Sequence, residues 1–92
     1  MTVIRGATTI AEDQPEEIKK AVGELLEQIE YRNQLKRDEI LSIVFSSTSD
    51  IHSFYPAKAA REAGFASCSL FSAQEPEIDG GLALCIRVML FI

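Results

Sequence analysis

The sequence predicts an α+β fold in which a mixed β-sheet has helices packed on one face. Apolar, β-branched segments and helical segments follow one another in the order strand, helix, strand, helix, strand, strand, which is typical of that architecture. The chain has 92 residues, of which 47% are hydrophobic and 25% charged. These values are ordinary for a folded protein, so residues 1–92 are expected to form one small domain.

The first strand and the first helix are predicted from the N-terminal third of the chain. Residues 2–10 are rich in β-branched side chains and should form a strand. Asp13 is expected to cap the following helix, with Pro15 in its first turn and Glu16 at its third helical position. Apolar residues then recur at spacings of three and four and predict an amphipathic helix with a solvated opposite face: Ile18, Ala21, Val22, Leu25, Leu26 and Ile29.

The later elements are shorter. Residues 33–38 should close the first helix. Strands are expected at 40–45, at 67–72 and from Leu82 onward, with a polar turn over 46–50, a short helix over 57–63 and a loop over 76–81. Pro56 begins that short helix and Gly64 ends it.

Composition excludes several classes of function. The net charge of −5 argues against nucleic acid and anionic membranes as partners. The N-terminus lacks the pattern of a signal peptide, and no apolar stretch is long enough to span a bilayer. Cys68 and Cys85 lack zinc-site spacing and are expected to be buried free thiols in the cytoplasm. No metal cluster or glycine-rich phosphate loop is present, so neither a metal nor a cofactor is predicted.

Arg87 is the most informative residue. It stands in the apolar run 82–92, which is typical of a buried strand, and an arginine cannot lose its charge to ease burial. Arg87 therefore has a carboxylate partner, reaches water at a strand end, or binds an anionic ligand. Glu75, just past the third strand, either pairs with Arg87 or orients a substrate hydroxyl group.

The cations divide into two groups. Five of the nine Lys and Arg residues belong to the first helix or its exit and are interpreted as solvated helix charges. The other four indicate a site for a small, multiply charged anion, or else are unrelated surface residues: Arg5, Lys58, Arg61 and Arg87. His52 follows Asp50 without a partnering Ser or Cys motif and is interpreted as a surface or capping histidine.

Linked motifs then resemble a known family. Residues 4–9, 54–61, 74–75 and 80–89 resemble the monofunctional chorismate mutases of the AroH class, in the family's order and at similar intervals. The resemblance implies an isomerase that converts chorismate to prephenate in aromatic amino-acid biosynthesis. It also implies a homotrimer with a pseudo-α/β-barrel core and active sites between subunits.

The resemblance also implies a role for each site residue. Arg87 matches the arginine that meets the ether oxygen of the breaking bond, Arg5 an arginine that binds a substrate carboxylate, and Glu75 the carboxylate that accepts a hydrogen bond from the ring hydroxyl. Tyr55 takes the place of an aromatic wall residue. Lys58 and Arg61 match cations at the cleft mouth. In the family Arg5, Glu75 and Arg87 come from one subunit, and Tyr55, Lys58 and Ser72 from its neighbour.

Two departures from the family pattern limit what the resemblance implies. Ser72 stands where the family usually has a cysteine, and a hydroxyl still offers a hydrogen bond. Family members continue past the last strand into a further strand, which carries a tyrosine, and a flexible tail. The chain is therefore expected to be either a fragment or a shortened protein. Two other functions stay open: a non-catalytic trimeric module that binds an anionic metabolite, and a trimeric deaminase-like protein.

Overall fold

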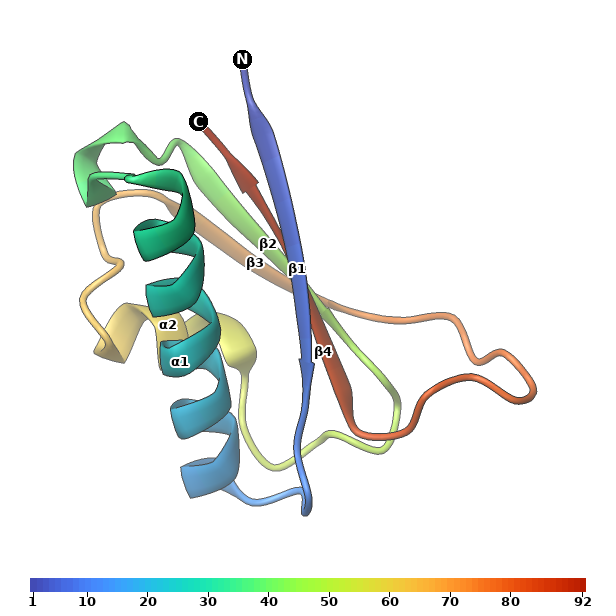
Figure 1. Cartoon of the computed structure of the whole chain (residues 1–92). Coiled ribbons are helices and arrows are strands. Elements are labelled where there is room, and N and C mark those ends of the chain that lie inside the picture. The colour runs from blue at the N-terminus through green and yellow to red at the C-terminus, as the bar shows by residue number, and fades with distance from the viewer.

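The computed structural model describes residues 1–92 as a four-stranded mixed sheet with both α-helices on one face (Figure 1). The elements in chain order are β1 (Val3–Thr9), α1 (Pro15–Asn33), a 3-10 turn (Arg37–Glu39), β2 (Ser42–Ser47), α2 (Pro56–Glu62), β3 (Ser69–Gln74) and β4 (Cys85–Phe91). The strand order is β1-β4-β2-β3. Strand β2 is parallel to β3, whereas β4 is antiparallel to both β1 and β2, which confirms the predicted mixed sheet.

Helix α1 packs against β1 and α2 through the predicted apolar stripe. Ile18, Val22 and Leu26 are fully buried there. A Cβ atom on Gly6 would lie 3.0 Å from Cδ1 of Ile29, so glycine allows the helix to approach β1 closely beside Arg5. The helix thus covers one face of the strand that carries the first site arginine.

The start of α1 differs from the prediction by one residue. The N-cap is Gln14 and it makes no side-chain capping bond, so the expected Asp13 cap is wrong. Asp13 instead accepts hydrogen bonds from the backbone N–H groups of His52 and Ser53 and from the Ser53 hydroxyl. Glu17 accepts backbone N–H bonds from Ala11 and Glu12, which ties the preceding loop to the first turn of the helix. Tertiary contact with the loop before α2 therefore displaces a local cap.

Successive side chains of strand β4 point to opposite faces of the sheet, and only one of these faces is covered, so the apolar run is not buried on both sides. Ile86, Val88 and Leu90 are buried beneath the helices, while Arg87 and Met89 are exposed on the opposite, open face of the sheet. The expectation of a fully buried strand was wrong because an apolar run does not reveal an uncovered face. Of the three alternatives for Arg87, the structure shows a carboxylate partner together with partial exposure to water.

Several strand boundaries also differ from the prediction. Strand β2 begins at Ser42 rather than at residue 40 and continues through Ser46 and Ser47, which were expected to lie in a turn. Strand β3 spans Ser69–Gln74 rather than 67–72, and β4 begins at Cys85 rather than Leu82. Leu84 adopts a left-handed conformation with φ of 48°, and its backbone N–H donates to Oδ2 of Asp50 at 2.9 Å. The shift places Ser46 inside the sheet beside Arg87. Neither helix combines the length and the hydropathy needed to cross a membrane.

Candidate functional site

Two arginines share one depression on the open face of the sheet. Arg5 on β1 and Arg87 on β4 line a hollow of about 640 Å³. In register, Arg5 lies opposite Met89 and Arg87 opposite Ala7, so the two guanidinium groups come from neighbouring strands on the same face. Arg5 has no carboxylate partner in the chain, and the hollow is therefore suited to an anionic ligand.

Glu75 lines a neighbouring depression of about 410 Å³, which Arg87 also lines, and pairs with Arg87. Nε of Arg87 is 3.2 Å from Oε1 of Glu75, with 51% of the arginine side chain and 23% of the glutamate side chain exposed. An ion pair this accessible to water contributes about 1 kcal/mol or less to folding. The Ser46 hydroxyl donates a hydrogen bond to the same Oε1 atom, and the Glu75 backbone N–H donates to the Ser47 carbonyl at 2.8 Å.

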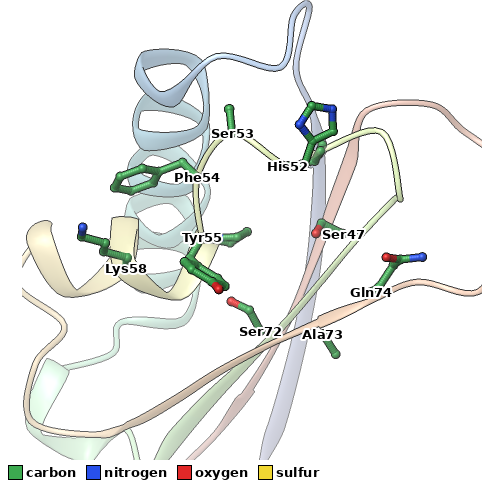
Figure 2. A pocket seen from close by; sticks show the side chains of 11 residues that line it. Ser47, His52, Ser53, Phe54, Tyr55, Lys58, Ser72, Ala73 and Gln74 are labelled. Carbon is green, nitrogen blue, oxygen red and sulfur yellow. The ribbon is translucent and has the colours of Figure 1, made fainter.

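A second group of predicted residues lines another depression, of about 560 Å³ (Figure 2). Tyr55, Lys58 and Ser72 come from the loop before α2, from α2 itself and from β3. The hydroxyl ends of Tyr55 and Ser72 point toward one another (Figure 2). Oγ of Ser72 also accepts the Ala57 backbone N–H at 3.0 Å, which fixes the first turn of α2 against β3. Tyr55 is 70% exposed, so its ring is available for contact with another molecule.

Within one chain, the two cations of α2, Lys58 and Arg61, do not point to a common site. Nζ of Lys58 lies 5.4 Å from the centroid of the Phe54 ring and turns away from Ser72 (Figure 2). Arg61 is exposed on α2 and lines neither depression. Arg37, expected to be merely solvated, instead pairs with Glu30 and lies 4.0 Å from the Phe65 ring centroid. Arg37 therefore has a structural role.

The two groups of site residues face opposite sides of the sheet. Arg87 lies opposite Ser46 in the register of β4 and β2, on the open face. Ser72 lies opposite Phe45, whose side chain is fully buried beneath the helices. Paired residues of neighbouring strands project from the same face. A single ligand therefore cannot contact both Arg87 and Ser72 of one chain.

Neither the two cysteines nor the single histidine forms a catalytic group, although His52 lines the second depression. Burial raises the pKa of the Cys68 thiol, and Cys85 is buried, so neither is suited to act as a nucleophile. The exposed His52 ring has Nδ1 3.3 Å from Asp13, as expected for a surface histidine. No group of three or more His, Cys, Asp or Glu side chains is arranged to hold a metal ion.

Comparison with known proteins identifies the family. The family model described as chorismate mutase type I matches residues 1–92. The chain belongs to the type I chorismate mutase family. Chorismate mutase AroH of Bacillus subtilis is 41% identical over 90 residues, which cover 97% of this chain and 71% of that protein. Chorismate mutase AroH of Thermus thermophilus is 40% identical over 87 residues, or 94% and 71% of the two chains.

A solved structure extends the comparison to three dimensions. The chorismate mutase from Clostridium thermocellum superimposes with a TM-score of 0.96 at 38% identity, covering 100% of this chain and 82% of that one. The resemblance seen in the motifs is therefore confirmed, as is the α+β fold of a chorismate mutase subunit.

One residue of this chorismate mutase family member escaped prediction from sequence. Ser46 joins Glu75 and Arg87 on the open face, although a run of Ser, Thr and Asp residues indicated a turn there. The alternation of Ser42, Val44 and Ser46 with the buried residues of β2 was the available signal. That period-two pattern continues into the polar run and would have extended the strand.

Proposed function

We propose that this member of the chorismate mutase family converts chorismate to prephenate in aromatic amino-acid biosynthesis. The observation that carries the proposal is that Arg5 and Arg87 share one depression, with Glu75 paired to Arg87. The rearrangement is pericyclic: the ether C–O bond breaks while a C–C bond forms, and no proton is transferred. A site rich in fixed cations and poor in acids and bases fits this chemistry.

In the proposed site Arg87 donates to the ether oxygen, where negative charge develops as the bond breaks. A preorganised donor of this kind is worth on the order of 3–4 kcal/mol in the transition state. Arg5 binds a carboxylate of the substrate, and Glu75 accepts a hydrogen bond from the ring hydroxyl. Arg87 has no partner in the chain beyond Glu75, which leaves most of its N–H donors available.

The complete active site requires a second copy of the chain. Arg87 and Ser72 project from opposite faces of the sheet, so Tyr55, Lys58 and Ser72 are supplied by the neighbouring subunit. Arg61, exposed on the same helix as Lys58, adds positive charge at the cleft mouth. We propose a homotrimer in which the open sheet faces meet in a pseudo-α/β barrel.

The exposed apolar side chains of the open face support this assembly. Val3 is 45% exposed, Phe71 62% and Met89 38%, and all three lie on the face that the helices leave uncovered. A subunit interface would remove this apolar surface from water. The two free thiols, Cys68 and Cys85, support a location in the reducing cytoplasm.

The test is to add chorismate and follow the loss of its ultraviolet absorbance, with prephenate identified as the product. We expect turnover by the unaltered protein and near-abolition by Arg87→Ala with an unchanged circular dichroism spectrum. Tight binding of a carboxylate ligand without turnover would show that the protein is a non-catalytic binding module rather than an enzyme. Sedimentation as a monomer at assay concentration would contradict the shared site.

A further inference from the structure

We propose that Ser46 is a positioning residue that limits Glu75 to one carboxylate oxygen in its pair with Arg87. The inference rests on the proposed function, since it assigns a role within that site. Ser46 Oγ donates to Oε1 of Glu75, and Nε of Arg87 lies 3.2 Å from the same oxygen atom. One carboxylate oxygen thus meets both the serine and the arginine, while Oε2 is left for the substrate hydroxyl.

The backbone positions of these groups explain why a hydroxyl is placed here. Ser46 lies in β2 between Arg87 of β4 and Ala73 of β3, in register with both. Glu75 comes directly after the last residue of β3, and its N–H is held by the carbonyl of Ser47. Its main chain is therefore fixed to β2, and the Ser46 hydroxyl is the one neutral donor on its carboxylate.

The preferred geometry of a carboxylate–guanidinium pair explains what would happen without the Ser46 hydroxyl. A carboxylate beside a guanidinium favours a bidentate pair with two parallel N–H···O bonds. An unrestrained Glu75 would adopt that pairing and occupy the Arg87 donors needed by the ether oxygen. It would also lose the free oxygen that accepts the ring hydroxyl. Ser46 prevents both by drawing Oε1 toward β2.

The experiment compares Ser46→Ala with Ser46→Thr in steady-state chorismate turnover. Because hydrogen bonds to charged groups are among the stronger ones, Ser46→Ala should lower kcat about tenfold and change KM less than about threefold. Ser46→Thr restores the hydroxyl in a strand that accepts β-branched residues, and should recover most of kcat. The melting temperature of Ser46→Ala should stay within a few degrees of the unaltered protein.

Ser49→Ala is the matched control. Its hydroxyl also donates to a glutamate, Glu77, at 2.5 Å. This exposed pair lines the depression that Glu75 and Arg87 also line, but it makes no hydrogen bond or ion pair with either of them. The control should leave kcat unchanged. In a Glu75→Gln background, Ser46→Ala should have less than about a twofold effect, since a role exerted through Glu75 disappears with its charge.

The outcomes separate the two proposals. No turnover by the unaltered protein overturns both the proposed function and this inference. Turnover with normal kcat in Ser46→Ala, or a full tenfold loss that persists in the Glu75→Gln background, overturns the role of Ser46 alone. A crystal structure of Ser46→Ala should show Glu75 paired to Arg87 through both oxygens, and an unmoved carboxylate would contradict the inference.

Discussion

Arg87 and Ser72 lie on opposite faces of one β-sheet. Arg87 is paired in register with Ser46 on the open face, and Ser72 with Phe45, a fully buried residue beneath the helices. Arg5, Glu75 and Arg87 belong to the open face, whereas Tyr55, Lys58 and Ser72 belong to the other side of the sheet. In the proposed trimer, each copy would contribute a different face to two neighbouring sites, so a small domain without a deep cavity of its own could supply complete sites.

Replacement of Arg87 by lysine should not be conservative. Lysine keeps the charge but lacks the planar fork that can meet Glu75 and the ether oxygen together. We expect Arg87→Lys to lower kcat by about 100-fold, comparable with the loss of one oxyanion-hole donor, while the free energy of unfolding changes by less than about 1 kcal/mol. Steady-state kinetics and urea denaturation of the same sample measure the two effects. A near-normal kcat for Arg87→Lys would show that the reaction does not require a guanidinium group at this position.

Stability should fall in acid partly because of Asp13. Burial alone would raise the pKa of Asp13, but hydrogen bonds from Ser53 and the backbone of His52, together with the His52 charge, hold the pKa below its usual value. A carboxyl group with a lowered folded-state pKa stabilises the fold above its unfolded-state pKa, and that contribution is lost as pH falls through the folded-state value. The free energy of unfolding should therefore decrease below about pH 4.

Urea denaturation over a series of pH values measures this dependence. Asp13→Asn should flatten the acid limb and lower stability at neutral pH, where the ionised group accepts its hydrogen bonds. Asp79→Asn, in the exposed loop before β4, is the matched control and should leave the profile unchanged. If the free energy of unfolding falls equally in acid for the unaltered protein and for Asp13→Asn, Asp13 contributes nothing to the pH dependence.

Gln34 offers a stabilising substitution. This residue follows α1 in the left-handed conformation, with φ of 50° and ψ of 44°, which costs an L-residue about 1 kcal/mol and glycine nothing. Gln34→Gly should raise the free energy of unfolding by about 1 kcal/mol. Gln28→Gly, at an exposed position within the helix, should lower it by a similar amount. Chemical denaturation of both variants measures whether the two substitutions change the free energy of unfolding in opposite directions.

The elements with regular periodicity could be predicted from sequence. The stripe from Ile18 to Ile29 identified α1 correctly because spacings of three and four give a helix one buried face. Arg5, Glu75 and Arg87 were expected to act together, and Arg87 lines both the depression of Arg5 and the depression of Glu75. The cost of burying a charge drew attention to Arg87, but this reason was wrong, because 51% of its side chain is exposed.

Features set by tertiary contact could not be predicted in this way. The apolar run around Arg87 did not show that one face of β4 lacks a covering layer. Local sequence favoured Asp13 as a helix cap, whereas the distant His52–Ser53 segment binds its carboxylate. Ser46 was expected in a turn because a polar run masked the alternation of β2. In each case a contact between distant residues overrides the local signal.

In the proposed trimer, one active site needs Arg87 from one subunit and Lys58 from the next. Arg87→Ala and Lys58→Ala should each be poorly active alone. After unfolding and refolding together in equal amounts, about one quarter of the sites in random trimers should contain both intact residues, because each site draws on two independently chosen subunits. Arg87→Ala mixed with Glu75→Ala is the control, since both changes affect the same face.

Chorismate turnover by the refolded mixtures is the most direct measurement of this claim. We expect recovery toward about one quarter of normal activity for Arg87→Ala with Lys58→Ala, and no recovery for Arg87→Ala with Glu75→Ala. Failure of the first mixture to exceed its separate components, although mixed trimers form, would contradict a site shared between subunits.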